Sequence, residues 1–275
     1  AAHHLIKKGI RTHRACELLS LPRSSLTYQA HPQHDDTLPA RIKAIALQYP
    51  RWGCRRVHAA LVREGVTVNR KTVHQIWKRE GLAFPTRRFS RKIRTGQHLP
   101  LPAEYPNHIW TYDFIFDQTS RGTPLKILTL TDEFTRRSLA IRCGTAFTSM
   151  DVKAVLKAAF NTNGVPMILR SDNGPEFIAH DLGEWLAEQG VIRKHSDPGK
   201  PWQNGIAESF HSRLRDELLN VEVFSSHGHA QVLIEAWRAF YNGIRPHSSL
   251  GYRTPNEFAA LHTATQAATT AVHSP

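Results

Sequence analysis

The run Ile109-Trp110-Thr111-Tyr112-Asp113-Phe114-Ile115-Phe116 decides the fold. Aromatic and β-branched residues fill it, which is typical of a buried strand, and Asp113 is an acid in its middle. Most single acids are solvated surface groups, but an isolated carboxylate among apolar neighbours is costly unless its charge is paired or binds a metal. We therefore expect Asp113 to lie mid-strand at the centre of a sheet and to belong to a metal site.

Two further acids stand in contexts that would bring them to the same place. Asp172 belongs to Ser171-Asp172-Asn173-Gly174, and Glu208 belongs to Gln203-Asn204-Gly205-Ile206-Ala207-Glu208-Ser209. Three carboxylates without a Cys or His ligand beside them favour hard cations such as Mg²⁺ or Mn²⁺ over Zn²⁺. The chemistry that uses such cations most directly is phosphoryl transfer. The Asn-Gly pairs at 173–174 and 204–205 are interpreted as loop architecture that presents the acids, not as catalysts.

The segments around these acids predict the order β-β-β-α-β-α-β-α. The predicted strands are 109–116, 125–130, 138–143, 167–169 and 191–192, and the predicted helices are 149–160, 176–188 and 201–219. Asp172 would then stand just past a strand beside the strand of Asp113, and Glu208 would reach in from a helix packed across the sheet. One or two Mg²⁺ ions held there, about 3.5–4 Å apart if two, would activate a water or a 3′ hydroxyl and stabilise the leaving oxygen.

Charge is distributed unevenly along the chain, whose net charge is +13. Residues 1–98 hold 20 Lys and Arg against 5 Asp and Glu, whereas residues 99–275 hold 16 against 18. Such a basic segment is the electrostatic footprint of a surface that meets DNA or RNA, although a basic face that serves only solubility is the alternative. No apolar run reaches the roughly 18 residues of a membrane span, and no signal peptide is visible. We expect a soluble intracellular protein with no membrane partner.

Residues 1–82 are predicted to form a small all-α DNA-binding region of helix-turn-helix type. The segments 11–20 and 23–29 have weak helix-turn-helix spacing. Asn69 can cap a later helix that buries Val73, Ile76 and Trp77. The polar residues of that helix, which could lie in a major groove, are Arg70, Lys71, Gln75, Lys78 and Arg79. A basic bundle whose charged face is only solvated remains the alternative.

Residues 83–105 are predicted to be a basic, Pro-containing linker between this region and a catalytic domain at 106–262. The residues of the linker that could follow a phosphate backbone are Arg87, Arg88, Arg91 and Lys92, unless it is a spacer without contacts of its own. Residues 263–275 are expected to be a disordered tail. The three cysteines are far apart and odd in number, which argues against a disulfide framework. The chain begins Ala1-Ala2 without Met, as a fragment or processed product would.

Together these motifs resemble the DDE transposases related to retroviral integrases. The motifs that show the resemblance are residues 110–114, 171–177, 201–205 leading to Glu208, and the tail Tyr241-Asn242-Gly243-Ile244-Arg245-Pro246-His247-Ser248-Ser249-Leu250-Gly251-Tyr252-Arg253-Thr254-Pro255. The tail is similar to the bacterial IS-three family of insertion-sequence transposases, specifically the catalytic product of their second reading frame. The resemblance runs from about Tyr49 to Phe258 and so covers most of the chain.

This resemblance implies a ribonuclease H-like α/β fold, a mixed sheet with flanking helices. It implies that Asp113, Asp172 and Glu208 form a metal-binding triad for Mg²⁺, with Mn²⁺ as a substitute. The implied reaction is cleavage of one DNA strand at the element end, followed by attack of the freed 3′ hydroxyl on another phosphodiester, with circles as the suggested intermediate. It also implies a homo-oligomer on DNA in the bacterial nucleoid, and a partner protein from the upstream frame, because this chain shows no leucine zipper.

The family often has a basic residue seven positions after the triad Glu, which here is Arg215. It lies two helical turns from Glu208 and so on the same face, where it could contact a terminal phosphate. An ion pair with Asp216 or Glu222 is the alternative.

Several other residues compete for a place in the site. Asp132 is interpreted as a turn residue or a support of the site, with contact to the metal as the alternative. Glu176 is interpreted as an acid at a helix start, and Asp197 as solvated. His247 is expected to help pack the C-terminal helix, with a role at the DNA as the alternative. Two rival functions remain: a nuclease with the same carboxylate chemistry but no joining activity, and a DNA-binding regulator whose catalytic domain is inactive.

Overall fold

A five-stranded mixed sheet is the centre of the molecule in the computed structural model, which describes residues 1–27, 37–83, 101–172, 174, 176, 179–195 and 204–262. The strands are β1 (Ile109–Gln118), β2 (Pro124–Asp132), β3 (Ser138–Gly144), β4 (Ile168–Ser171) and β5 (Ile192–His195). Their order across the sheet is β3-β2-β1-β4-β5, so β1 is central. It pairs antiparallel with β2 and parallel with β4. The predicted order of strands and helices is confirmed.

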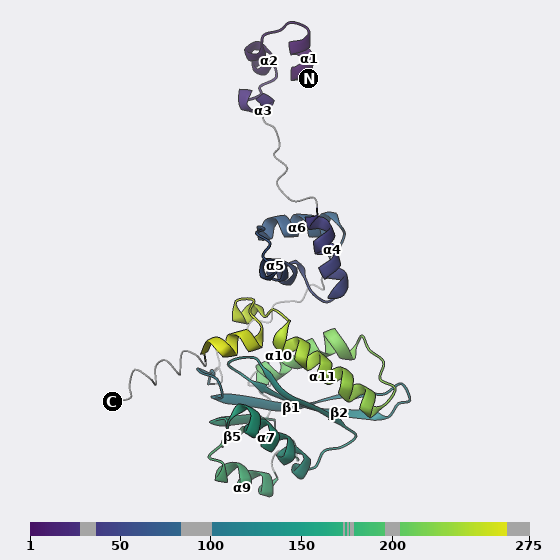
Figure 1. The fold of residues 1–275 in the computed structure, drawn as a ribbon, viewed down its shortest axis with the longest axis vertical. Coiled ribbons are helices and arrows are strands. Elements are labelled where there is room, and N and C mark those ends of the chain that lie inside the picture. The colour runs from purple at the N-terminus through teal and green to yellow at the C-terminus, as the bar shows by residue number, and fades with distance from the viewer. Residues whose placement is uncertain are drawn as a thin grey trace, which may run out of the picture.

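Helices cover both faces of this sheet. They are α7 (Ser149–Asn163) and α9 (His180–Glu188) on one face, and α10 (Gly205–Leu214) and α11 (His227–Gly243) on the other, as Figure 1 shows. Side chains of a strand alternate between faces, so Trp110 and Tyr112 join the apolar cluster under α7 and α9. Ile115 joins the cluster under α10 and α11. Asp113, two residues before Ile115, therefore faces α10.

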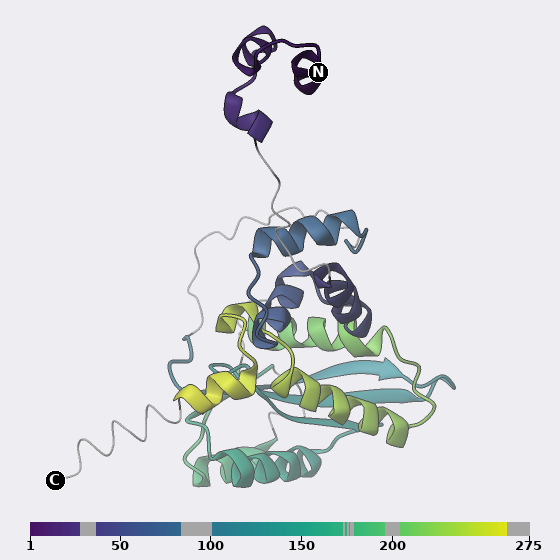
Figure 2. The same ribbon diagram turned by 45° about the horizontal axis from the view of Figure 1, so that its top comes forward.

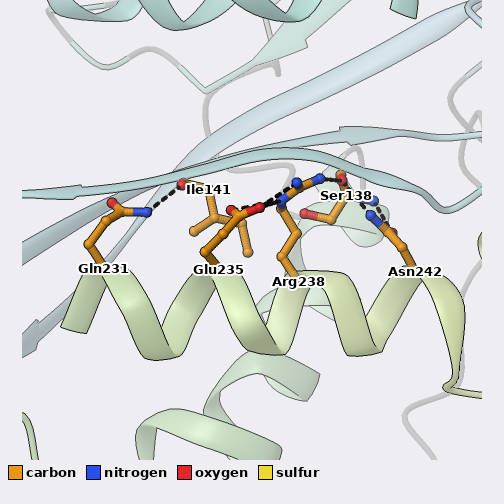
Figure 3. A network of polar contacts seen from close by, with 6 residues as sticks. All are labelled: Ser138, Ile141, Gln231, Glu235, Arg238 and Asn242. Atoms are coloured by element: carbon orange, nitrogen blue, oxygen red, sulfur yellow. Dashed lines mark hydrogen bonds and ion pairs between the residues drawn. The ribbon is translucent and has the colours of Figure 1, made fainter. Parts of the chain in front are cut away.

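Helix α11 fastens the edge strand β3 through polar side chains (Figure 3). Gln231 accepts a hydrogen bond from the Cys143 amide at 2.8 Å and donates to the Ile141 carbonyl at 3.3 Å. Asn242 exchanges two hydrogen bonds with the backbone of Ser138, at 2.8 and 2.9 Å. Unpaired backbone groups of an edge strand would otherwise offer a pairing site to another chain. The contacts of α11 satisfy several of them.

The amino-terminal part is helical, as predicted. Its helices are α1 (Ala2–Lys7), α2 (Thr12–Leu18), α3 (Arg23–Thr27), α4 (Leu38–Gln48), α5 (Cys54–Arg63) and α6 (Arg70–Arg79). Helices α4–α6 share one apolar cluster, and the Asn69 side chain caps α6 by accepting the Lys71 amide at 2.8 Å. Helix α1 was not anticipated from the sequence. No helix in the described part of the chain combines the length and apolarity that a bilayer span needs.

Helices α4–α6 dock against the half of the core that contains α10 and α11, as Figure 2 shows. Tyr49 and Trp52 stack on Phe240 of α11, with ring centroids 5.4 and 6.0 Å away. Arg63 donates to the Ile244 carbonyl at 3.2 Å and pairs with Glu257. The helical region and the sheet domain therefore share an interface with both apolar and charged contacts. We refer to α4–α6 as the helical module.

Two predicted helices differ from the structure. The helix expected over 176–188 is interrupted: Glu176 is helical, but the backbone of Ala179 is not, with ψ of 136°, and Ala179 is the N-cap of α9, which begins at His180. Of the helix expected over 201–219, residues 201–203 lie outside the described residues, Gly205–Leu214 is α-helical, and Arg215–Leu219 continues as a π-helix. In this wider turn two consecutive leucines, Leu218 and Leu219, are both buried. The apolar periodicity of an α-helix does not predict the change to a π-helix.

Candidate active site

Asp113 and Asp172 meet because β1 and β4 run parallel in register. Ile109 lies opposite Ile168 and Thr111 opposite Arg170. Continuing this register by two residues brings Asp113 opposite Asp172, which is the first residue after β4. The Asp172 carboxylate is exposed, and its Oδ1 accepts the Gly174 amide at 3.0 Å. The prediction that Asp113 lies mid-strand and Asp172 just past a neighbouring strand is confirmed.

Glu208 completes the group from the first turns of α10, which packs on β1. The pKa of Asp113 is raised to about 6, first by burial, next by the negative charge of Asp172, and to a smaller extent by that of Glu208. The Asp113 carboxylate therefore feels the negative charges of both other acids. Within the described residues none of the three has an ion pair with Lys or Arg.

The donor set of this group fits a hard divalent cation. It offers carboxylate oxygens, the ligands that Mg²⁺ and Mn²⁺ prefer, and it carries negative charge that no Lys or Arg of the described residues balances. In the described part of the chain, no three His, Cys, Asp or Glu side chains lie close enough together to hold a metal ion as they stand. Mg²⁺ usually keeps several waters and uses few carboxylates, so an open arrangement of this kind suits it.

Asn204 holds the Asp113 carboxylate in place. The sequence analysis interpreted Asn204 as loop architecture and missed this contact. Its Nδ2 donates to Asp113 Oδ2 at 2.8 Å, and its Oδ1 accepts the Thr111 hydroxyl at 3.0 Å. Asn204 is 8% exposed and is the N-cap residue of α10. The side-chain hydrogen bond fixes Oδ2 of Asp113. Its Oδ1 accepts the Phe114 backbone amide at 2.7 Å and has no side-chain hydrogen bond within the described residues.

His211 also lies at the site and was not anticipated from the sequence. The Thr129 hydroxyl donates to the Asp113 carbonyl at 3.0 Å and contacts His211 Nε2 at 2.8 Å. Because a hydroxyl has one proton, Nε2 must be the donor to Thr129, and the lone pair of Nδ1 lies 4.0 Å from Asp113 Oδ2. Burial, with a smaller contribution from Arg215, lowers the pKa of His211 to about 4. The only hint in the sequence is its position three residues after Glu208.

Arg215, at the start of the π-helix, contacts β1, the strand that carries Asp113. Its Nη2 donates to the Phe116 carbonyl at 3.2 Å, and the side chain is otherwise exposed. The alternative ion pairs with Asp216 or Glu222 are not formed, and Asp216 instead lies 3.9 Å from Arg51 of the helical module. A contact between Arg215 and a terminal phosphate stays a prediction.

The predicted DNA-binding residues of α6 share one exposed surface. They are Arg70, Lys71, Gln75, Lys78 and Arg79. The opposite side of α6 buries Val73, Ile76 and Trp77, as predicted. The linker residues Arg87, Arg88, Arg91 and Lys92 lie outside the described residues, as does Asp197.

The competing acids have structural partners. Asp132 is 2% exposed and accepts the backbone amides of Asn107, Phe134 and Thr135 at 2.8–2.9 Å, as expected of a turn residue. Glu176 pairs with Lys126 of β2. His247 is buried and meets the Tyr241 ring edge to face, with centroids 4.6 Å apart. Its packing role against α11 is confirmed.

Comparisons with known proteins find matches along most of the chain. Two family models described as "Integrase core domain" match residues 103–201 and 189–255, and one described as "HTH-like domain" matches residues 33–89. The chain is 40% identical over 261 residues to the insertion element IS407 uncharacterized 31.7 kDa protein of Burkholderia multivorans, covering 94% of both chains. It is 27% identical to the transposase for insertion sequence element IS904 of Lactococcus lactis, covering 81% of this chain and 93% of that one.

A solved structure shares the fold at low sequence identity. It is a simian T-cell lymphotropic virus intasome in complex with PP2A regulatory subunit B56 gamma. The match has a TM-score of 0.50 and 17% identity, and covers 86% of this chain and 75% of the other. It supports the ribonuclease H-like architecture of the sheet domain and nothing finer.

Proposed function

The chain belongs to the IS-three-like family of insertion-element transposases with an integrase core domain, and on that premise we propose that it cleaves and joins DNA at insertion-element ends. In this proposal it cuts one strand at the element end and directs the freed 3′ hydroxyl to another phosphodiester. The proposal rests on the parallel register of β1 and β4, which pairs Thr111 with Arg170 and, continued by two residues, sets Asp113 opposite Asp172. The raised pKa of Asp113 supports it, because Asp172 and Glu208 both contribute to that shift.

Asp113, Asp172 and Glu208 would hold Mg²⁺, or Mn²⁺ in its place. When bound, the cation would supply Lewis-acid chemistry, lowering the pKa of the attacking hydroxyl and stabilising the leaving oxygen. The residues around the triad then keep it in one arrangement. Asn204 fixes one oxygen of Asp113, and Thr129 fixes the backbone carbonyl of the same residue. Such preorganisation is a principal source of rate enhancement in phosphoryl transfer.

The helical region at 1–82 would bring the element ends to the catalytic domain at 106–262. The exposed surface of α6 would meet DNA, the linker at 83–105 would connect the two, and residues 263–275 would be a tail. A homo-oligomer would bring two ends together on DNA in the bacterial nucleoid, with a partner from the upstream frame. Exposed cations on α6 support the DNA contact, because phosphate neutralisation supplies most sequence-independent affinity.

A strand-transfer assay tests the proposal on labelled duplexes that carry the ends of the parent element, with Mg²⁺ or Mn²⁺. Asp172→Asn and Glu208→Gln should each abolish joined products, and Glu188→Gln, which changes an exposed acid on α9, should leave them unchanged. Cleavage by the unaltered chain without any joining would favour the nuclease. DNA binding with neither reaction, in the presence of the upstream-frame protein, would favour the regulator.

A further inference from the structure

Four arginines line one cavity of about 310 Å³ on the side of α10 next to Glu208. They come from four separate segments, α5, the β2–β3 turn, α10 and the chain after α11. The four residues are Arg56, Arg136, Arg213 and Arg245. Three serines also line it: Ser209, Ser248 and Ser249. Among the described residues that line the cavity there is no carboxylate.

The positive charge of the cavity is only partly balanced. The Glu217 carboxylate accepts three hydrogen bonds from Arg245, at 2.6, 2.7 and 2.9 Å, and lies 3.9 Å from Arg56. One carboxylate therefore serves two guanidinium groups. Arg136 and Arg213 make no side-chain hydrogen bond or ion pair with the residues that the structure describes. Burial lowers the pKa of Arg136 although the charges of Glu133 and Asp132 act in the opposite direction, and both oxygens of Glu133 are held by Arg170.

The pKa shifts of two groups that line the cavity agree with an excess of positive charge in it. Burial, followed by the charge of Arg245, lowers the pKa of Arg56 to about 10. Burial also lowers the pKa of His247 to about 3, with further contributions from all four arginines. His247 is therefore neutral at physiological pH and adds no charge of its own.

We propose that this cavity binds a phosphate group of the DNA backbone, at a site separate from the three carboxylates. Planar guanidinium groups match the oxygen geometry of phosphate, and the serine hydroxyls supply additional neutral donors. The inference rests on the proposed function, since it names where the DNA strand engaged by the catalytic domain is held.

The position of the cavity points to the backbone of that same strand. Gly205 and Ser209, which line it, flank Glu208 on α10. Thr131 also lines it and pairs with Thr111 of β1, two residues before Asp113 and so about 7 Å from it along the strand. A single strand carries one phosphate per about 3.4 Å of duplex axis, so a strand at Asp113 has other phosphates within reach of the cavity.

The cavity also joins the two parts of the chain. Arg56 belongs to the helical module, whereas Arg213 and Arg245 belong to the sheet domain. A phosphate held by both parts would tighten their contact, because it would bridge guanidinium groups that now repel one another. Binding of the DNA strand and docking of the helical module would then favour each other.

The test is the affinity of the full chain for an element-end duplex, measured by fluorescence anisotropy in EDTA across a salt series. Arg136→Gln and Arg213→Gln remove cations without described partners, so neither should disturb folding. We expect the double variant to bind at least about tenfold more weakly, with a salt slope shallower by about 1–2. Arg142→Gln, an exposed arginine on β3, is the matched control and should bind like the unaltered chain.

Single neutral methylphosphonates placed along either strand of the duplex identify the ligand. One position should weaken binding of the unaltered chain and have no effect on the double variant. If the double variant binds like the Arg142→Gln control, the proposal is wrong. If inorganic phosphate raises the Tm of the unaltered chain but no methylphosphonate position behaves as described, the cavity binds free phosphate and the backbone assignment is wrong.

These readouts do not depend on catalysis. Binding is measured without metal, and it can be repeated in the Asp172→Asn background. If the unaltered chain shows no strand transfer but the double arginine variant still binds DNA more weakly, the proposed function is wrong and the phosphate site stands. If the unaltered chain carries out strand transfer and the double variant binds DNA normally, the proposed function stands and the phosphate site is wrong.

Discussion

The two faces of the central sheet use the same strand for different purposes. On the face covered by α7 and α9, Trp110 and Tyr112 enter a cluster of apolar side chains. On the face covered by α10 and α11, Thr111 and Asp113 meet polar partners before Ile115 returns the strand to an apolar core. Alternation along one strand thus separates the residues that stabilise the fold from those that form the candidate site. The apolar face anchors β1, and the polar face can then hold a charge that disfavours folding.

The largest effect is expected from Asp113→Asn on the polar face. It should reduce strand transfer by roughly a thousandfold or more, equivalent to about 4 kcal/mol of transition-state stabilisation, because a ligand for the cation is lost. The free energy of unfolding in EDTA at pH 7.5 should stay the same or rise, because the variant removes a negative charge. The raised pKa of the Asp113 carboxyl group indicates that this charge is unfavourable in the fold. Product gels and urea denaturation measure the two quantities. A destabilised variant would contradict the separation of roles.

The opposite pattern is expected from Leu156→Ala on the apolar face. Leu156 is 1% exposed on α7, so its truncation should lower the free energy of unfolding by about 2–5 kcal/mol. Strand transfer per folded molecule should be unchanged at a temperature where the variant stays folded. Met150→Ala on the same helix, at a side chain 74% exposed, is the control and should change stability by less than about 0.5 kcal/mol.

Stability should depend on pH through Asp113 in a direction unusual for an acid. Its pKa is raised from 3.8 to about 6 in the fold, so the protonated form is favoured by folding. This contribution is present in full below pH 4 and is lost as the pH rises through about 6, by roughly 1–3 kcal/mol. Urea denaturation in EDTA at pH 4 and 7.5 should show the loss in the unaltered chain and not in Asp113→Asn. An equal pH dependence in both would refute the assignment.

The pH dependence of cation binding should have the opposite sign. Mg²⁺ competes with the proton for the Asp113 carboxylate, so its affinity should rise as the pH increases through about 6. Calorimetric titration with Mg²⁺ at the two pH values measures this difference.

The smallest effect is expected from Gln231→Ala, which loosens the attachment of the edge strand β3 (Figure 3). Loss of its hydrogen bonds to Cys143 and Ile141 should cost about 1 kcal/mol. The Cys143 amide should exchange with solvent faster, while the amides of β1 should keep their protection. Uniformly faster exchange would show that α11 supports the whole sheet and not only its edge.

Much of this architecture could be predicted from the sequence, because the relevant signals are local. The apolar and aromatic run around Asp113 predicts a central strand, and the turn residues after Ser171 predict that Asp172 stands at a strand end. Asn69 predicts the start of α6, and its side chain does cap that helix. Each of these signals depends only on residues close by in the sequence, so each can be recognised without the tertiary structure.

The missed features depend on how distant elements are rotated against one another. Asn204 and His211 reach Asp113 only because α10 presents one particular side to β1. The convergence of Arg136, Arg213 and Arg245 requires three segments to meet, and no spacing in the sequence encodes it. The π-helical turn at 215–219 likewise reflects packing of the leucines it carries.

The parallel register of β1 and β4 also sets which changes in chain length the gene can tolerate. A single codon inserted into β1 ahead of Asp113 would turn that carboxylate toward α7, because successive residues point to opposite faces. Two inserted codons would restore the face but shift Asp113 by about 7 Å from Asp172. The turn at 119–123, with Gly122 at a φ of 78°, lies beyond the carboxylate and can lengthen without moving it. Insertions and deletions should therefore accumulate after Asp113 and be purged before it.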